Sequence, residues 1–290
     1  MSIQVRNLSY VYNEGMPDEQ TALDNINFSI YDGEIAAVIG HTGSGKSTLV
    51  QHLNGLLKPK EGTILVGGVD ITRKNVSMRD IRCRVGLVFQ YPEYQLFEET
   101  VEKDVAFGPK NLGLSDAEIQ VRVQEALELV GLDYRRIGQR SPFDLSGGQK
   151  RRVAIAGVIA MKPQVLILDE PTAGLDPGAH RDIMRMIRDI HEAENNIIIF
   201  VTHNMNDVVE LSDKVLVLSS GKLVTVGSPR EVFSQGFELS SVGLDVPPAR
   251  QIVSALKERG ENVRSDVLTI DEAEREIERV LQKKQEMRKA

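Results

Sequence analysis

The sequence predicts an α/β fold with one large domain, a helical insert and a small C-terminal appendage. Continuous apolar runs at residues 35–39, 165–168 and 197–201 are typical of parallel strands that are buried on both faces of a sheet. From about Ser115 the apolar period changes from that of strands to that of helices. With 290 residues, 41% of them apolar, the chain is long enough to bury a large core.

Strands are expected to dominate the first part of the chain. Apolar side chains alternate along residues 3–10 and 26–30, and short apolar runs lie at 64–66 and 85–89. A glycine-rich loop in this part leads into a helix that is expected from Ser47 to Leu57.

Residues from about 92 to 160 are expected to form the helical insert. Ser115 and Glu118 have the spacing of a capping box, in which two side chains satisfy the first free N–H groups of a helix. The apolar stripe that follows stops before Gly131.

The chain is expected to divide into a domain of residues 1–235 and a C-terminal extension of residues 236–290, which is expected to serve dimerisation. Within the extension, a helix is predicted inside residues 247–260. The short apolar run at 267–270 predicts a small α/β unit, and a charged helix is expected to begin at Asp271.

The glycine-rich loop has the residue types of a phosphate-binding site. Residues 40–47 match G-x-x-x-x-G-K-[ST], in which backbone N–H groups and a helix N-terminus point at phosphate oxygens. Lys46 is expected to reach the β- and γ-phosphates, and the hydroxyl of Ser47 to ligate the Mg²⁺ that bridges them. The expected ATP-binding residues of the loop are Gly40, His41, Thr42, Gly43, Ser44, Gly45, Lys46, Ser47 and Thr48.

Polar side chains follow three of the predicted strands. Asp169 and Glu170 end one strand, where ligands gather in parallel sheets, and such a pair can also cap a helix. Beside a phosphate loop, catalysis is favoured: Asp169 would help to hold Mg²⁺, and Glu170 would orient or deprotonate the attacking water. His203 would contact the γ-phosphate and this water, and Gln90 would reach the metal and the water as a neutral ligand. The predicted metal site comprises Ser47, Gln90 and Asp169.

A second motif, Leu145-Ser146-Gly147-Gly148-Gln149, lies about a hundred residues after the phosphate loop. The order along the chain is the phosphate loop, Gln90, this motif, Leu168-Asp169-Glu170, Gly174-Leu175-Asp176 and His203. This order resembles that of the ATP-binding cassette (ABC) ATPases over residues 1 to about 230. The resemblance implies an ABC-type P-loop nucleotide-binding domain with an antiparallel β subdomain and a helical insert.

The resemblance also implies how the motifs work. Two subunits would pair head to tail, so that Leu145 to Gln149 of one subunit close over the ATP held by Lys46 of the other. Gly174, Leu175 and Asp176 would form the loop through which the two sites communicate. Tyr12 matches the aromatic residue that stacks on adenine, and Tyr10 is a neighbouring candidate.

A narrower resemblance is to the ATPases of energy-coupling factor (ECF) transporters, which import vitamins and metal ions. It rests on the C-terminal extension and on three stretches, at residues 91–97, 104–109 and 149–157. The pair His41-Thr42 resembles the second of the two paired ATPases of these modules. The alternative is that His41 is a loop residue with no specific role. Asn204 departs from the Asp that many cassette ATPases carry after the histidine.

The ECF resemblance implies three protein partners: a second ABC ATPase, identical or related, a transmembrane coupling protein, and a separate membrane protein that binds the solute. The stretch from Tyr94 to Phe97 follows Gln90 directly and is predicted to form part of the docking surface for the transmembrane partner. Because Leu96 and Phe97 are apolar, burial in the chain's own core is the alternative. The chain is expected at the cytoplasmic face of the cell membrane, as a peripheral subunit.

Composition agrees with these expectations. The apolar runs are far shorter than the roughly 20 residues of a membrane helix. The N-terminus lacks the apolar segment of a secretion signal, and the single Cys83 excludes an intramolecular disulfide. Cys83 lies between two arginines that could lower its pKa, but a structural role is expected. The net charge of −7 argues against a nucleic-acid partner.

Two other functions fit part of the sequence. A soluble cassette ATPase acting on ribosomes or DNA would normally carry two cassettes or long coiled coils, and the sequence has neither. A small-molecule kinase would use the phosphate loop but would leave residues 145–149 without a purpose.

Overall fold

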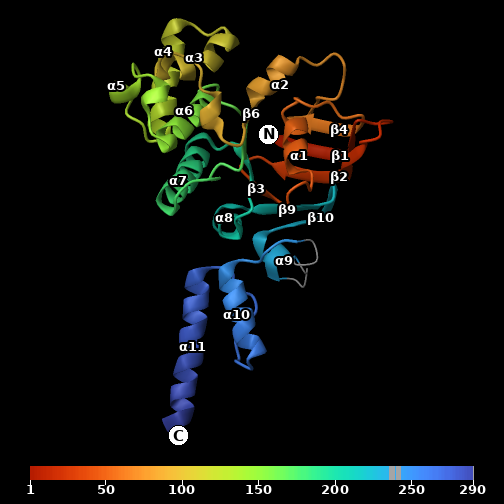
Figure 1. Cartoon of the computed structure of the whole chain (residues 1–290), viewed down its shortest axis with the longest axis vertical. Helices are drawn as coiled ribbons and strands as arrows, with labels where there is room; N and C mark the ends of the chain where they lie inside the picture. The colour runs from red at the N-terminus through yellow and green to blue at the C-terminus, as the bar shows by residue number, and fades with distance from the viewer. Residues whose placement is uncertain (235–238, 240–242, 290) are drawn as a thin grey trace.

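The computed structural model describes residues 1–234, 239 and 243–289 and is shown in Figure 1. In chain order the elements are β1 (Ser2–Tyr12), β2 (Gln20–Tyr31), β3 (Ile35–Ile39), α1 (Lys46–Leu53), β4 (Glu61–Val66), β5 (Val69–Asp70), α2 (Met78–Arg84), β6 (Val85–Val88), η1 (Pro92–Gln95), α3 (Val101–Leu112), α4 (Asp116–Leu129), α5 (Tyr134–Ile137), η2 (Pro142–Asp144), α6 (Gly147–Ile159), β7 (Val165–Asp169), α7 (Pro177–Glu194), β8 (Ile197–Val201), α8 (Met205–Leu211), β9 (Lys214–Ser219), β10 (Lys222–Gly227), α9 (Pro229–Ser234), α10 (Pro248–Glu258) and α11 (Ile270–Lys289).

A six-stranded sheet with the order β10-β9-β3-β8-β7-β6 forms the centre of the molecule. Every neighbouring pair in it is parallel except β10 and β9, which are antiparallel. Parallel strands align their carboxyl ends, so the segments that follow β3, β6, β7 and β8 all leave the sheet at one edge.

Both faces of this sheet are buried, which explains the continuous apolar runs of its strands. Along β3, Ile35, Ala37 and Ile39 belong to one hydrophobic core, whereas Ala36 and Val38 belong to the other. The first core is completed by α3, α4, α6 and α7, and the second by α1 and the antiparallel strands. The predicted α/β class is confirmed.

The second sheet has four strands in the order β2-β1-β4-β5 and is antiparallel. Figure 1 shows it on the opposite side of the central sheet from α3 to α6. Its apolar residues share a core with α1. Helix α1 ends at Leu53, four residues earlier than predicted. Asn54 caps it, and Gly55 has a φ of +72°, a left-handed conformation that ends a right-handed helix.

Helices occupy most of the stretch from residue 92 to residue 160, and their ends follow local chemistry. The Ser115 hydroxyl accepts from the N–H of Glu118, and the Glu118 carboxylate accepts from the N–H of Ser115, so the predicted capping box begins α4. The same reciprocal arrangement of Ser146 and Gln149 begins α6. No helix of the described residues is both long enough and apolar enough to cross a bilayer.

The C-terminal extension differs in one respect from the expected α/β unit. Its described residues, 239 and 243–289, form helices α10 and α11 but no strand of the predicted kind. Of the expected strand, Val267 is buried in a small core with residues of α10 and α11, and Leu268 is buried in the main core. No second strand is available among the described residues of the extension to pair with them. The predicted boundary at 235 and 236 lies outside the described residues.

Arg151 of α6 is the largest side chain that is fully enclosed, with 2% of its surface exposed. Its Nε and Nη2 donate to the two carboxylate oxygens of Glu93, at 3.0 and 2.8 Å. Its Nη1 donates to the carbonyls of Pro171 and Ala173, at 3.1 and 2.9 Å. Burial would raise the pKa of Glu93, but the hydrogen bonds and charge of Arg151 lower it below its usual value.

Replacing Arg151 with Met should lower the free energy of unfolding by about 3 kcal/mol, because the Glu93 carboxylate is left buried without its partner. Guanidinium-induced unfolding measures this change. Arg136→Met is a suitable control, since Arg136 and its partner Asp133 are both exposed and such pairs contribute about 0.5 kcal/mol. Equal effects of the two substitutions would show that the buried pair is not a major source of stability.

Candidate functional site

The candidate site lies where the carboxyl ends of the central parallel strands meet. A cavity of about 390 Å³ opens there between the glycine-rich loop, the end of β7 and the antiparallel sheet. Its lining comprises Tyr12, Gln20, Ala22, Thr42, Gly43, Gly45, Lys46, Ser47, Thr48, Gln90, Asp169, Glu170 and Val201. The structure thus gathers most of the residues that the sequence predicts to bind the nucleotide and the metal.

The loop between β3 and α1 is shaped by glycines. Gly45 has a φ of +105°, and a Cβ there would lie 2.5 Å from the carbonyl oxygen of Ala22. Gly43 has a φ of +81° and faces open space. In a cradle of this kind, an anion can approach the backbone N–H groups closely. Side chains at the glycine positions would block that approach.

Lys46 is held over the loop. Its Nζ donates to the carbonyls of Gly40 and His41, at 2.7 and 2.9 Å. Burial lowers the pKa of Lys46, while the negative charges of Glu170 and Asp169 act in the opposite direction. The ammonium group therefore stands between the loop carbonyls and two carboxylates, where phosphate oxygens would find a cation.

Two carboxylates complete this end of the cavity. Burial raises the pKa of Asp169, against the opposing effects of a hydrogen bond from Ser47 and of the Lys46 charge. The Ser47 hydroxyl and the Asp169 carboxylate are therefore adjacent. These are the oxygen ligands that Mg²⁺ prefers, and exposed Gln90 on the same cavity adds a neutral oxygen.

Glu170 has a strained and well-defined position. Its φ of +50° lies in the left-handed region, and its N–H donates to the carbonyl of Val201 at 3.1 Å. Its Oε2 lies 2.8 Å from Nδ1 of His203, whose side chain is 76% exposed. Burial raises the pKa of Glu170, against the opposing effect of His203, so the carboxylate is a stronger proton acceptor than an exposed one.

The structure separates two aromatic candidates. Tyr12 lines the cavity, and its hydroxyl lies 3.3 Å from Oγ1 of Thr48. Tyr10 is outside the lining and packs edge-on against buried His52, with ring centroids 4.6 Å apart. His41 is also outside the lining, and its Nε2 accepts from the N–H of Ser220 at 3.4 Å.

Three other residues of the loop differ in their position relative to the cavity surface. Gly40 and Ser44 lie beneath the loop rather than on the cavity surface, and Ser44 is fully buried. A Cβ at Gly40 would meet the Ser44 hydroxyl and the Leu218 carbonyl, both at 2.4 Å, so this position must be glycine for the loop to pack. Thr42 is exposed at the rim.

The second motif lies outside the cavity of its own chain. Leu145 is buried, whereas Ser146 and Gly147 are exposed at the start of α6, and Gly148 and Gln149 follow in its first turn. None of these five lines the cavity. Gly174, Leu175 and Asp176 also lie at the surface, where the Asp176 carboxylate caps α7 by accepting from Gly178 and Ala179 at 2.8 and 3.0 Å.

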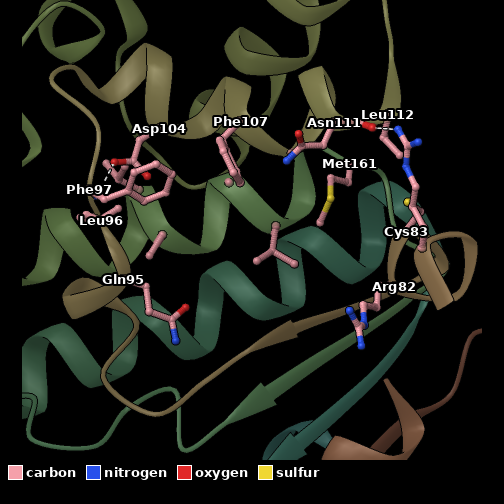
Figure 2. Close-up of a pocket in the computed structure, with 16 residues that line it drawn as sticks. Arg82, Cys83, Gln95, Leu96, Phe97, Asp104, Phe107, Asn111, Leu112 and Met161 are labelled. Carbon is pink, nitrogen blue, oxygen red and sulfur yellow. Dashed lines mark hydrogen bonds between the residues drawn. The ribbon is translucent and has the colours of Figure 1, made fainter. Parts of the chain in front are cut away.

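A second, largely apolar cavity of about 450 Å³ lies beside the stretch predicted for docking (Figure 2). Phe97 is 58% exposed, and its ring packs edge-on against that of Phe107, which is also exposed. Tyr94 is exposed as well, but Leu96 is only 7% exposed and belongs to the main core. Leu96 also lines this cavity, but its side chain packs inward from the segment after η1, so the alternative of core burial applies to Leu96 within the predicted docking stretch.

Cys83 lines this second cavity. Burial raises its pKa, against the opposing charge of Arg79, so the lowering that its flanking arginines suggested is wrong. One flanking residue, Arg82, instead turns its guanidinium to the carbonyl of Gly55, at 3.2 Å.

The sequence motifs omit some residues that the structure brings to these sites. Gln20 and Ala22 line the nucleotide cavity from β2, and Arg151 organises the segments around it. No local pattern marks Gln20 or Ala22, because only the packing of one sheet against the other brings them there. Arg151 does lie in the stretch after the second motif, but its partners are distant in sequence.

Comparisons with known proteins agree with this geometry. A family model described as ABC transporter matches residues 23–173. The energy-coupling factor transporter ATP-binding protein EcfA2 of Caldanaerobacter subterraneus subsp. tengcongensis is 56% identical over 281 residues, covering 97% of this chain and 98% of the relative. EcfA2 of Clostridioides difficile is 55% identical over 282 residues, covering 97% and 98%.

Solved structures give the same assignment. The structure of cbiO1 from Clostridium perfringens, described as part of the ABC transporter complex cbiONQ, matches with a TM-score of 0.74 and 39% identity, covering 88% of this chain and 98% of that one. The dimeric, post-hydrolysis structure of the ATP-binding cassette MJ0796 with ADP and Pi matches with a TM-score of 0.69 and 28% identity, covering 78% and 98%. The family predicted from the motifs is confirmed. The chain belongs to the ABC transporter ATPases and, within them, to the energy-coupling factor transporter ATP-binding proteins.

Proposed function

We propose that this chain binds and hydrolyses ATP to energise an ECF-type importer of vitamins or metal ions. The observation that carries the proposal is the cavity that combines a glycine-rich phosphate cradle, Lys46 and the paired carboxylates Asp169 and Glu170. Tyr12 at the cavity would stack on the adenine base. The loop residues that line the cavity, Thr42, Gly43 and Gly45 to Thr48, would hold the phosphates, with Gly40 and Ser44 supporting the loop from beneath.

The residues fit a magnesium ion that arrives with the nucleotide. Ser47, Asp169 and Gln90 lie on the same cavity, so these three would hold the ion. When bound, Mg²⁺ neutralises charge on the β- and γ-phosphates. Lys46 adds its own charge to the same phosphates.

Hydrolysis would depend on Glu170. Its buried carboxylate, with a raised pKa, would orient the attacking water and accept its proton. His203, 2.8 Å from Glu170, would hold this carboxylate in place and contact the γ-phosphate. Gln90 would help to position the water.

Replacing Glu170 with Gln should lower kcat by at least about a hundredfold while ATP binding is retained, because the amide keeps the shape but cannot accept the proton. Steady-state hydrolysis and equilibrium binding of a fluorescent ATP analogue measure the two effects. Lys46→Ala should instead weaken binding. Hydrolysis by Glu170→Gln within about tenfold of the parent would exclude Glu170 as the base.

The working unit would be a head-to-tail dimer with a second ABC ATPase, identical or related. Leu145, Ser146, Gly147, Gly148 and Gln149 would then contact the ATP of the opposite subunit, in line with their position outside the cavity of their own chain. Gly174, Leu175 and Asp176 would lie between the two sites. The extension of residues 236–290 would contribute to this dimer.

A mixed dimer tests the shared sites. Lys46→Ala in one subunit and Ser146→Arg in the other both fall on the same composite site, so the second site should keep all its parts. Trapped nucleotide per dimer should then fall to about half of the parent value. If the substitutions damaged both sites equally, the sites would not be shared between subunits.

The second cavity, lined by Phe97, Phe107 and Cys83, would receive a segment of the transmembrane coupling protein. Its apolar rings are exposed in the isolated chain, and exposed apolar patches of this kind mark protein contacts. Gln90 lies seven residues before Phe97, so a change at the nucleotide would reach this surface through a short segment. A separate membrane protein would bind the solute, and the chain would be peripheral at the cytoplasmic face of the membrane.

Cys83 offers a direct test of docking, because it is the only cysteine of the chain. Assembly with the transmembrane partner should slow its alkylation by a maleimide, read by mass spectrometry of the Cys83 peptide. Phe97→Asp should weaken assembly while ATP hydrolysis by the isolated chain stays near that of the parent.

Met16→Asp is the matched control, because Met16 is 62% exposed and lies outside this cavity. Equal alkylation of the free and assembled chain, together with normal assembly of Phe97→Asp, would rule this surface out. Leu96 is unsuitable for the test, since a charge there would disrupt the core.

The alternative, a soluble cassette ATPase that acts on ribosomes or nucleic acid, is not favoured. The relatives above are transporter subunits, and the net charge is −7. Co-purification from the native host distinguishes the two: membrane proteins support the transporter, and nucleic acid supports the alternative.

A further inference from the structure

A hydrogen-bonded pair of side chains outside the nucleotide cavity joins the two helices that follow the catalytic segments. Nε2 of His180, in the first turn of α7, lies 2.7 Å from Oδ1 of Asp207 in α8. The His180 side chain is 22% exposed and that of Asp207 only 6%. None of the motifs assigned above includes either residue.

Burial makes this pair energetically unusual. The second carboxylate oxygen of Asp207 is enclosed and has no hydrogen-bond partner among the described residues. Burial raises the pKa of Asp207, and the hydrogen bond and charge of His180 only partly oppose this. A buried carboxylate with one free oxygen is costly, so apolar packing would join these helices at lower cost.

Each helix begins at a segment that the proposed function uses. Helix α7 is capped by Asp176, whose carbonyl accepts from the N–H of His180 at 2.9 Å. Helix α8 is capped by Asn204, the residue that follows His203. Asp207 comes four residues after His203, which is about one helical turn. A contact at Asp207 therefore acts close to the imidazole that reaches Glu170.

Other charged groups surround the pair but do not replace it. A cavity of about 640 Å³ beside it is lined by Arg181, Arg185 and Arg188 of α7 and by Glu210 of α8. Of these, Arg188 donates to the carbonyl of Glu210 at 3.3 Å, a second and more exposed tie between the helices. The Asn204 amide lies 3.5 Å from the His180 ring, at the limit of a hydrogen bond.

We infer that His180 and Asp207 are positioning residues for hydrolysis: they fix α8 against α7, so that the loop of residues 174–176 and the imidazole of His203 move together. This inference rests on the roles proposed for Glu170 and His203. Neither His180 nor Asp207 contacts the nucleotide cavity, and both would act through His203.

The test compares His180→Ala with His180→Gln in the full-length chain assembled with its partners. Loss of the contact in His180→Ala should lower kcat about tenfold, since misplacing a catalytic group by a fraction of an ångström has effects of this size. The Kd for a fluorescent ATP analogue should stay within about twofold, because the cradle is untouched. The Gln amide can donate to Asp207, so His180→Gln should recover most of the lost kcat.

A double-variant cycle adds a second measurement that is independent of stability. Because the residues act as a unit, His180→Ala with Asp207→Leu should lower kcat no more than the more damaging single change. Glu34→Gln is the control: it removes the charge from a partly buried ion pair with Lys214, and neither residue lines the nucleotide cavity or the cavity beside His180. It should lower Tm but leave kcat unchanged.

The inference is overturned if His180→Ala and Asp207→Leu keep the parent's kcat, if kcat falls only as far as the folded fraction does, or if His180→Gln recovers nothing. If His180→Ala does not fold, Asp207→Leu, which is similar in size and cannot accept a hydrogen bond, decides alone. Glu170→Gln, measured in parallel, separates this inference from the proposed function. If Glu170→Gln is active, the proposed catalytic roles are refuted. If Glu170→Gln is inactive but His180→Ala is fully active, only the positioning roles are refuted.

Discussion

One buried guanidinium determines how the functional segments lie relative to one another. Arg151 projects from α6, which begins within the motif of residues 145–149. It donates two hydrogen bonds to the carboxylate of Glu93, three residues after Gln90. Its remaining donor reaches the carbonyls of Pro171 and Ala173, directly after Glu170. The planar, permanently charged guanidinium matches a carboxylate with two parallel bonds and still has a nitrogen for the backbone, which Lys cannot do. A shift of any one of these segments therefore strains the other two.

The parallel sheet supplies the second constraint. Four strands deliver the glycine-rich loop, Gln90, Glu170 and His203 to a single edge because their carboxyl ends are aligned. Burial at that edge raises the pKa of Glu170 and lowers that of Lys46, while their opposite charges limit both effects. The same enclosure that stabilises the fold thus sets the proton affinity of the proposed base.

Two exposed surfaces of the chain would contact other subunits in the proposed function. The exposed residues Ser146 and Gly147 stand at a helix N-terminus, a favourable place for a phosphate, but they do not line the cavity of their own chain. The rings of Phe97 and Phe107 are exposed beside an apolar cavity. In the proposed complex, the second ATPase would cover the first surface and the membrane partner would cover the other.

The sequence by itself determined the features that depend on local chemistry: the phosphate loop, the capping box at Ser115, and strands that are apolar throughout because both faces of the sheet are buried. Only the tertiary structure decided which of Tyr10 and Tyr12 meets the cavity, and that Leu96 packs inward while Phe97, the next residue, stays exposed. It also decided that residues 267–270 form no strand and that Arg151 and Asp207 are buried with hydrogen-bonding partners. Each of these depends on neighbours that are tens of residues away, and the free energy of burying a side chain is set by those neighbours rather than by the residues beside it in the sequence.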